Sequence, residues 1–264
     1  MVRTGGGADV PPIVTLLSDF GGESGYPAQM KGAVLCACPD AVLVDLAHSV
    51  PPFDVLAGAL MLERCVGAFP DSAVHLAVVD PGVGSPRRAI CVVDVEGRRF
   101  VGPDNGLFTP FLDGAAVRLL SAPGIVPVPG SATFHGRDLF APVAAWLAAG
   151  GDPARLGPEV GDPVRLDWPR AVRRGDELHG RTLAADPFGN LVTSIRERDL
   201  VGRVTLAWVG DRQARWVRTF AEGAAGELLA MIGSGGRVEI AVREGSAAEA
   251  LGDVRGLPVR VRVG

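Results

Sequence analysis

The chain has 264 residues, of which 47% are hydrophobic, so it is long enough to form one large or two modest packed domains. Its formal net charge of −4 argues against a general binder of nucleic acid or of membrane surfaces, because such proteins carry an excess of basic residues. No apolar run is long enough to span a bilayer, and the opening MVRTGGGADVPP lacks the apolar region of a signal peptide. We therefore expect a cytoplasmic protein with a flexible leader.

The cysteines do not form a recognisable framework. Cys36, Cys38, Cys65 and Cys91 lie at apolar positions and show no paired CxxC spacing. We interpret them as buried thiols in a reducing compartment, not as disulfides or a zinc site. No HExxH motif, His pair or acid cluster has metal-ligand spacing, so no metal is expected.

The first half of the chain alternates between apolar strands and amphipathic helices. The pattern predicts strands at Ile13–Leu17, Val42–Leu46 and Val74–Asp80, separated by helices at Tyr26–Cys38 and Phe53–Phe69. This β-α-β-α-β order is typical of a mainly parallel sheet with right-handed crossovers. We therefore predict an N-terminal α/β domain.

Two of these strands lead into an acid that a glycine-rich turn follows. Asp19 comes after the first strand, and Asp80 comes after the third, within VVDPGVGSPRR. Since open α/β sheets bind ligands at the carboxyl ends of their strands, both carboxylates are candidate site residues. The turn after Asp80 is short enough to bring Arg87 back beside it. Either acid could instead cap its own turn or the next helix, and the residues alone leave this open.

The next segments predict a β-hairpin and a turn. Ala89–Val95 and Arg98–Val101 form the arms of the hairpin, and GPDNG then predicts a turn that starts another helix. Within that turn, Asn105 could either face a pocket or form an Asx turn.

One histidine lies where a loop meets a predicted helix. TFHGRD precedes a helix at Leu139–Ala149, and a side chain at such a boundary is well placed to contact a ligand, which makes His135 a candidate. The other histidines have no comparable setting: His48, His75 and His179.

The pattern changes after a Pro- and Arg-rich connection around Asp162–Glu177, and we predict domains at residues 1–167 and 168–264. Beyond it the apolar segments are short and separated by turn residues, which favours a small antiparallel β-barrel or a sandwich. The predicted strands are Arg181–Asp186, Leu191–Ile195, Val204–Val209, Arg215–Phe220, Leu228–Ile232, Arg237–Val242 and Leu257–Val263.

Taken together, the motifs resemble one family. SDFGG, VDLAHSVPPFD, VVDPGVGSPRR, GPDNG, TFHGRD, DPFGN and GSGGRVEIAVREG occur in the order and spacing of the S-adenosylmethionine hydroxide adenosyltransferases, relatives of the fluorinase and chlorinase enzymes. The resemblance implies an α/β N-terminal domain, a C-terminal β-barrel, and a homotrimer whose sites lie between one subunit's N-terminal domain and its neighbour's C-terminal domain. The implied reaction is hydrolysis of S-adenosylmethionine to adenosine and methionine, with neither metal nor cofactor.

The resemblance also assigns roles to individual residues. Asp80, Arg87 and His135, here called the catalytic trio, match the catalytic residues of the hydrolases. Such a trio could orient a water molecule, take its proton or stabilise hydroxide, and the sequence does not decide between these roles. The matched substrate-binding positions are Asp19 at the ribose, Asn190 near the adenosine, and Ser234, Glu239 and Val242 in the C-terminal part of the pocket.

Two alternatives to the hydrolase remain. The first is a halogenase, but these enzymes carry Tyr where Asp80 stands, and the fluorinase carries Tyr-Ser where His135 and Gly136 stand. The second is a non-catalytic protein that binds S-adenosylmethionine or adenosine, although such a protein would be free to lose the catalytic trio. Arg243, where relatives often have Asn, departs from the family pattern at the adenine end of the pocket.

Overall fold

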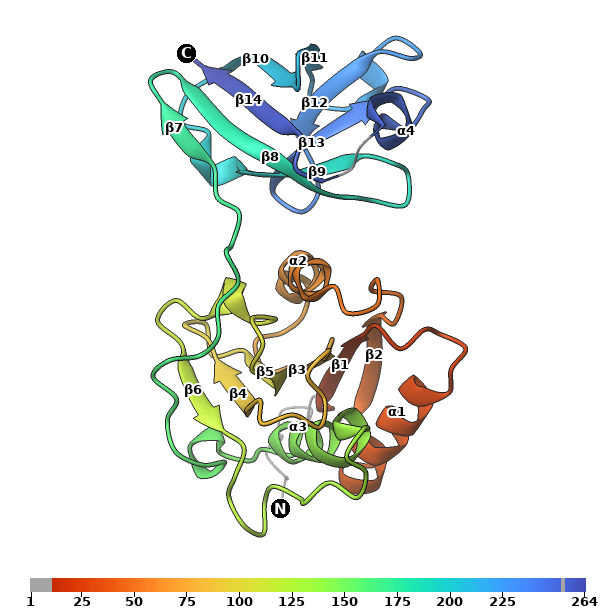
Figure 1. Ribbon diagram of the computed structural model, residues 1–264, viewed down its shortest axis with the longest axis vertical. Helices are drawn as coiled ribbons and strands as arrows, with labels where there is room; N and C mark the ends of the chain where they lie inside the picture. Colours follow the sequence, from red (N-terminus) through yellow and green to blue (C-terminus); the bar gives the residue numbers. More distant parts are fainter. Residues whose placement is uncertain (1–10, 253–254) are drawn as a thin grey trace, which may run out of the picture. The chain divides into compact units, whose positions relative to one another are not determined.

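Figure 1 shows the computed structural model of the chain, which describes residues 11–252 and 255–264. The chain divides after Leu166 into two compact units, and the second begins at Asp167. Most of the predicted leader lies outside the described residues. None of the helices in the described ranges is both long enough and apolar enough to cross a membrane.

Unit 1 is built around a six-stranded sheet in the order β2-β1-β3-β5-β4-β6. β1 pairs in parallel with β2 and β3, and β3 pairs in parallel with β5, whereas β4 pairs antiparallel with β5 and β6. The predictions of a parallel-rich α/β domain and of a β4–β5 hairpin are thus confirmed. The strands are β1 (Ile13–Ser18), β2 (Val42–Ala47), β3 (Val74–Val78), β4 (Ala89–Val93), β5 (Arg99–Pro103) and β6 (Ala116–Leu119).

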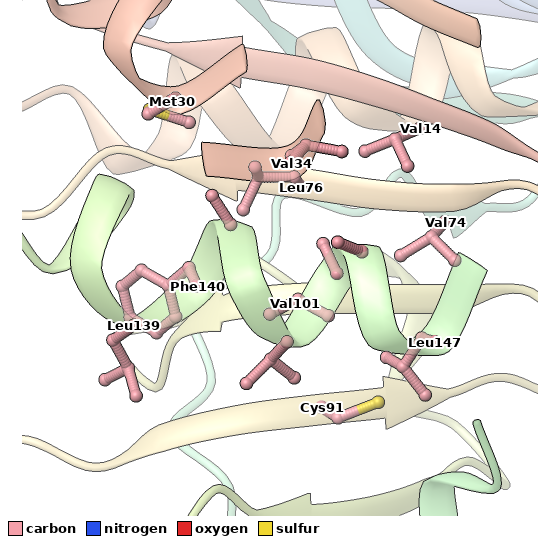
Figure 2. Close-up of a cluster of buried hydrophobic side chains, with 14 of the residues drawn as sticks. Val14, Met30, Val34, Val74, Leu76, Cys91, Val101, Leu139, Phe140 and Leu147 are labelled. Atoms are coloured by element: carbon pink, nitrogen blue, oxygen red, sulfur yellow. The ribbon is translucent and has the colours of Figure 1, made fainter. Parts of the chain in front are cut away.

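Helices cover both faces of this sheet, with α1 (Tyr26–Ala37) and α3 (Ala141–Ala148) on one face and α2 (Val55–Cys65) on the other (Figure 1). Successive residues of a strand point to opposite faces, so Val14 and Leu16 of β1 share a core with residues of α1 and α3. Figure 2 shows part of this core, including Val14, Val34 and Leu147. Burial on both sides explains why the central strands are continuous apolar runs.

The helix ends differ from the predicted ones for local reasons. α2 begins later than the predicted helix at Phe53–Phe69, because the Asp54 carboxylate accepts the backbone N–H of Ala57 at 2.9 Å and so caps the first turn. It also ends earlier, at Cys65, where a 3₁₀ turn follows. The helix predicted at Leu139–Ala149 begins earlier, with a π-helical turn η3 (Gly136–Phe140) that continues into α3. Such turns often occur at functional sites.

Two sequence interpretations in unit 1 are wrong. The segment after GPDNG forms no α-helix but a single 3₁₀ turn, η2 (Thr109–Phe111), because Gly114 soon turns the chain with a φ of 74°. The four cysteines are not all buried either, since Cys36 is exposed and Cys65 is only partly covered. Cys36 lies off the apolar stripe by which α1 packs on the sheet. Two further 3₁₀ turns are η1 (Val66–Ala68) and η4 (Pro153–Arg155).

Unit 2 is an eight-stranded sheet in which seven strands close into a barrel. The order is β14-β10-β11-β12-β13-β9-β8-β7, and β14 also pairs with β8. The barrel prediction is confirmed, and the sandwich is excluded by this closure. The strands are β7 (Val172–Arg174), β8 (Glu177–Ala185), β9 (Leu191–Arg196), β10 (Val204–Val209), β11 (Arg212–Trp216), β12 (Leu228–Ile232), β13 (Arg237–Val242) and β14 (Pro258–Val263).

The barrel departs from the prediction in three places. β11 begins before the predicted strand at Arg215–Phe220, and it pairs with β12 in parallel, so the barrel is not entirely antiparallel. β7 lies in the segment predicted as a connection, and β8 begins at Glu177, before the predicted strand at Arg181–Asp186. A short helix, α4 (Ala247–Leu251), was not predicted, although Ser246 caps it by accepting the backbone N–H of Glu249 at 3.1 Å. The remaining 3₁₀ turns are η5 (Glu197–Asp199) and η6 (Phe220–Glu222).

Candidate active site

The two predicted acids lie at the carboxyl ends of neighbouring parallel strands. Asp19 directly follows β1, and Asp80 lies two residues beyond β3. β1 and β3 pair in register up to Ser18 and Val78, so their ends reach the same edge of the sheet. This is the edge at which open α/β sheets bind ligands.

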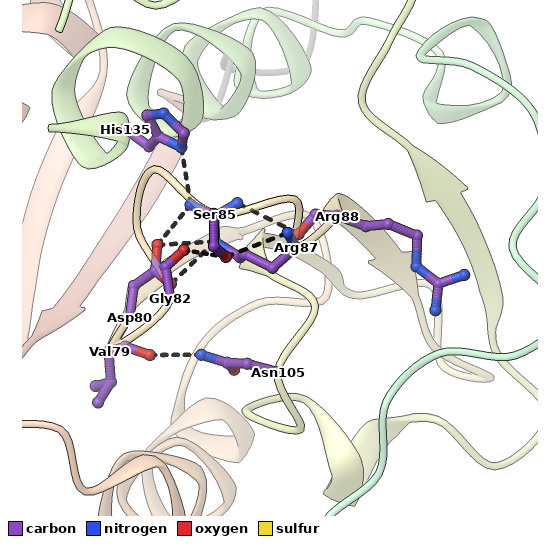
Figure 3. Close-up of polar contacts among 8 residues, drawn as sticks. All are labelled: Val79, Asp80, Gly82, Ser85, Arg87, Arg88, Asn105 and His135. Carbon is purple, nitrogen blue, oxygen red and sulfur yellow. Dashed lines mark hydrogen bonds and ion pairs between the residues drawn. The ribbon is translucent and has the colours of Figure 1, made fainter. Parts of the chain in front are cut away.

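The catalytic trio is assembled around Arg87 (Figure 3). Arg87 Nε donates to Asp80 Oδ1 and Oδ2 at 2.9 and 3.0 Å, and Nη2 donates to Oδ2 at 2.5 Å. The same Nη2 also donates to His135 Nδ1 at 2.9 Å. The side chains of Asp80 and Arg87 are only 3% and 10% exposed. The predicted return of Arg87 to Asp80 is therefore present, and His135 joins the pair from the turn before η3.

This arrangement determines what His135 can do. A guanidinium only donates hydrogen bonds, so His135 Nδ1 accepts, and the proton of the neutral imidazole lies on Nε2. Partial burial lowers the pKa of His135, and the charge of Arg87 lowers it further, while Asp80 and Asp138 oppose the shift. Near neutral pH His135 therefore presents an N–H donor at Nε2.

Packing and the turn fix the trio. The guanidinium of Arg87 lies over the ring of Phe140 in η3, with Cζ 5.2 Å from the ring centroid. Ser85 Oγ donates to the carbonyl of Gly82 at 2.6 Å and closes the turn between Asp80 and Arg87. A Cβ at Gly82 would lie 3.3 Å from Ser85 Oγ, so the close approach within this turn favours glycine.

Asn105 holds the backbone just after β3. Its Nδ2 donates to the carbonyl of Val79 at 2.8 Å (Figure 3), and its Oδ1 accepts the backbone N–H of Leu107 at 3.2 Å. The second contact is the Asx turn that the sequence left as one option. The first holds the residue immediately before Asp80, a role that sequence reasoning missed because it links positions far apart in the chain.

The neighbouring Arg88 belongs to a different network. Its Nε donates to Asp104 Oδ2 at 2.6 Å, and its Nη1 donates to Asp162 Oδ1 at 2.6 Å. Asp104 also accepts the backbone N–H of Val164 at 2.8 Å, so this network ties the turn to the segment that precedes Leu166. Of the two adjacent arginines, only Arg87 joins the trio.

Asp19 is not a member of the trio. Its Oδ2 accepts the backbone N–H of Phe53 at 2.9 Å, from the turn before α2. Phe53 has a φ of 67°, an unusual conformation for a residue with a side chain. The Asp19 carboxylate is thus held by a backbone donor at the same sheet edge.

The candidate residues of unit 2 lie around two neighbouring strands. Asn190 immediately precedes β9, Ser234 lies in the turn before β13, Glu239 lies within β13, and Val242 ends it. β9 and β13 pair, with Glu239 opposite Val192. Asn190 and Glu239 are buried, Val242 is partly exposed, and Ser234 is exposed.

Local contacts hold these barrel residues. Asn190 Nδ2 donates to Asp186 Oδ2 at 2.9 Å, and Asp186 Oδ1 accepts the backbone N–H groups of Phe188 and Asn190 at 2.9 Å. A Cβ at Gly233 would overlap the carboxyl group of Glu239, so the glycine of GSGG makes room for this acid. Asn190 is therefore held within its own turn, and Glu239 lies beside a position that only glycine fits.

The trio offers groups that can act on a water molecule. A carboxylate, a guanidinium and an N–H donor can bind and orient a small oxygen nucleophile and stabilise negative charge on it. Among residues 11–252 and 255–264, no group of three or more His, Cys, Asp or Glu side chains is arranged to hold a metal ion.

Both units match models of one family. Residues 14–157 match the SAM hydroxide adenosyltransferase N-terminal domain, and residues 180–260 match the C-terminal domain. A relative from Thermus thermophilus, named (R)-S-adenosyl-L-methionine hydrolase, is 44% identical over 259 residues, covering 94% of this chain and 98% of the relative. A fluorinase from Nocardia brasiliensis is 29% identical over 295 residues, covering 96% of this chain and 97% of the fluorinase.

A solved structure shares the fold. An uncharacterized conserved protein from Thermotoga maritima superimposes with a TM-score of 0.87 at 32% identity, covering 94% of this chain and 99% of that one. These matches confirm the resemblance that the motifs indicated. The chain belongs to the SAM hydroxide adenosyltransferase family.

Proposed function

We propose that the protein hydrolyses S-adenosylmethionine to adenosine and methionine. The observation that carries this proposal is the catalytic trio, assembled in a chain that is 44% identical to a hydrolase over nearly its whole length. Fluorinases are less similar, at 29% identity, and by resemblance they carry Tyr where Asp80 stands. A carboxylate at this position would repel a halide, which favours water as the nucleophile.

The proposed reaction requires a correctly positioned water oxygen and no acid for the leaving group. The oxygen of water forms a bond with the ribose 5′ carbon while the bond from that carbon to sulfur breaks, and one proton of the water is released. Methionine leaves as a neutral thioether, so no acid has to protonate it. For the same reason we expect no metal or other cofactor to be required.

The hydrogen bonds suggest how the trio divides this work. Asp80 Oδ1 accepts one bond from Arg87 whereas Oδ2 accepts two, so Oδ1 keeps more acceptor capacity for a proton of the water. His135 Nε2 offers an N–H to the oxygen, since Nδ1 is already occupied by Arg87. In this assignment His135 stabilises the developing hydroxide and is not the base.

Product analysis in isotopically labelled water tests the reaction. The purified protein should convert S-adenosylmethionine to adenosine and methionine, with solvent oxygen at the 5′ position of adenosine. Halogenated adenosine formed at a comparable rate in added chloride or fluoride would show a halogenase instead. Binding without turnover would show the non-catalytic alternative.

We also propose that the protein acts as a homotrimer in which unit 1 of one subunit and unit 2 of a neighbour complete each site. The division of the candidate residues between two separately folded units supports this proposal. Closed rings repeat one heterologous interface, so each ring would hold equivalent sites.

Mixed oligomers test the shared site. Asp80→Ala should be inactive, and Asn190→Ala should turn over with a raised KM. In rings assembled from equal amounts of both, about a quarter of the interfaces would combine two intact halves and should show the wild-type KM. If verified mixed rings show no fraction of activity with the wild-type KM, the shared site is excluded. An active monomer in light scattering would also exclude it.

A further inference from the structure

A second polar cluster lies at the carboxyl ends of β1 and β2, outside the catalytic trio. Ser18 Oγ lies 2.7 Å from His48 Nδ1, and His48 Nε2 lies 3.0 Å from Asp45 Oδ1. Lys31 Nζ donates to the other oxygen of Asp45 at 2.6 Å. Ser18 and His48 are 0% and 8% exposed, whereas the side chains of Asp45 and Lys31 reach the solvent. The cluster is therefore a chain of hydrogen bonds that runs from the interior to the surface.

Each nitrogen of the His48 ring has a defined hydrogen-bond partner. A carboxylate only accepts, so His48 Nε2 carries the proton that Asp45 receives. The other ring nitrogen, Nδ1, bonds with the hydroxyl of Ser18, and Ser18 Oγ also accepts the backbone N–H of Phe20 at 3.4 Å. Partial burial opposes the shift, but hydrogen bonds from Lys31 and His48 lower the pKa of Asp45, which keeps it a charged acceptor. The orientation of the His48 ring is therefore determined at both nitrogens.

The order of these groups matches that of a hydrolytic triad, but the geometry excludes that role. Ser18 lies at the end of β1 and is fully buried, so its hydroxyl cannot reach a substrate. A buried triad of this kind can act only through the groups that adjoin it.

The adjoining group is Asp19. Ser18 precedes it and Phe20 follows it, and both belong to the series of hydrogen bonds that leads to His48. The carbonyl of His48 also accepts the backbone N–H of Gly21 at 2.7 Å. The backbone is thus tied to His48 on both sides of Asp19, through the ring before it and through the carbonyl after it.

We propose that His48 is a positioning residue that holds Asp19 in the orientation needed to bind the ribose hydroxyls of the substrate. This inference rests on the proposed function, because it takes Asp19 as the ribose ligand. Without the imidazole, the Asp19 turn loses the side-chain half of its attachment, and the carboxylate samples orientations that do not meet the ribose. Ribose binding weakens, while the catalytic trio remains in place on β3, its turn and η3.

The same strand supplies a matched control. Thr15 Oγ1 lies 2.8 Å from Nδ1 of His75, a fully buried histidine on β3. Thr15 thus makes the same kind of hydroxyl–imidazole contact as Ser18, but three residues earlier, within the strand and not next to Asp19. Disrupting either hydroxyl–imidazole pair removes a buried hydrogen bond. Only the loss of the Ser18–His48 pair should weaken ribose binding.

The experiment is a double-mutant cycle read by nucleoside binding. Dissociation constants of adenosine and 2′,3′-dideoxyadenosine are measured by calorimetry for the wild type, His48→Ala, Asp19→Ala and the double variant. His48→Ala should weaken adenosine about tenfold in the wild-type background, and less than about twofold in the Asp19→Ala background, because coupled residues are not additive. For the dideoxy nucleoside, His48→Ala should have little effect. His48→Gln, which can still bond to Ser18, should recover part of the adenosine affinity.

Several outcomes would overturn the proposal. Equal losses for both nucleosides, or a His48→Ala effect that is undiminished without Asp19, would show that His48 does not act through this carboxylate. His75→Gln and Thr15→Val should lower the thermal midpoint without any ribose-dependent change, and if they reproduce the His48→Ala pattern the effect is only structural. If Asp19→Ala itself does not distinguish the two nucleosides, the ribose assignment and the positioning role both fail. Turnover of S-adenosylmethionine by the wild type tests the proposed reaction separately.

Discussion

The catalytic trio of unit 1 and the candidate pocket residues of unit 2 are held in different ways. In unit 1, the side chains of Asp80, in the turn after β3, and His135, just before η3, each bond to Arg87, which links them into one group. In unit 2, Asn190 bonds to Asp186 within its own turn, and Glu239 packs against Gly233 in its own hairpin. The first is one group linked through Arg87, whereas Asn190 and Glu239 lie beside different turns.

This difference indicates different kinds of contribution. Charged groups that are fixed before the substrate arrives can stabilise charge that develops during the reaction, so they act on the rate. Single polar groups on a barrel contribute hydrogen bonds that are similar in the ground state and the transition state, so they act on affinity. We therefore expect unit 1 variants to change kcat and unit 2 variants to change KM.

Removing Arg87 should have the largest effect, because it eliminates the bonds to both other members of the trio. Arg87→Ala should lower kcat about 10²–10⁴-fold, with a smaller change in substrate affinity. The adjacent Arg88→Ala is the control, since Arg88 bonds to Asp104 and Asp162 outside the trio. Steady-state rates of adenosine release measure both. A similar loss of kcat in the two variants would remove the distinction between the arginines.

The second prediction concerns acid stability, where unit 1 carries a buried group that can take up a proton. Burial, helped by the charge of Arg98 and opposed by that of Asp94, lowers the pKa of His75 to about 4. In the unfolded chain the pKa is about 6.5, so protons bind more tightly to the unfolded state. The stabilisation is complete above about pH 6.5 and is lost as the pH falls toward 4. The difference between the folded and unfolded pKa values of His75 corresponds to about 3 kcal/mol in the free energy of unfolding.

Urea unfolding as a function of pH, with hydrogen exchange to resolve the two units, measures this loss. Unit 1 of the wild type should lose stability between about pH 6.5 and 4, and His75→Gln should flatten its pH dependence over the same window. The barrel is the internal reference in each sample. Identical pH dependence in the wild type and His75→Gln would mean that this histidine does not control acid unfolding.

Much of the architecture was predictable because it depends on short-range patterns. The apolar runs at Val74–Asp80 and Leu228–Ile232 identified their strands, and Asp19 and Asp80 were found because a strand leads into each. The proximity of Arg87 to Asp80 also followed from a short glycine turn. These inferences need only local periodicity and loop length.

Other features depend on contacts that no local pattern contains. The setting of His48 was missed because its bond to Ser18 spans 30 residues and exists only when β1 and β2 pair in parallel. The parallel pairing of β11 with β12 is likewise a property of barrel closure and not of either strand. The helix expected after GPDNG is absent for a local reason, because Gly114 turns the chain soon after the 3₁₀ turn η2.

The smallest expected effect comes from the barrel. Asn190→Ala removes an amide that is held by Asp186, and the carboxylate of Asp186 keeps its two backbone donors, so the turn should survive. Losing one hydrogen bond to the adenosine would weaken substrate affinity about tenfold and leave kcat nearly unchanged. Titration of the KM for S-adenosylmethionine, with Gln213→Ala on β11 as a barrel control, measures this. A loss of kcat as large as that of Arg87→Ala would show that Asn190 contributes to the reaction itself, and the division of work between the two units would then be wrong.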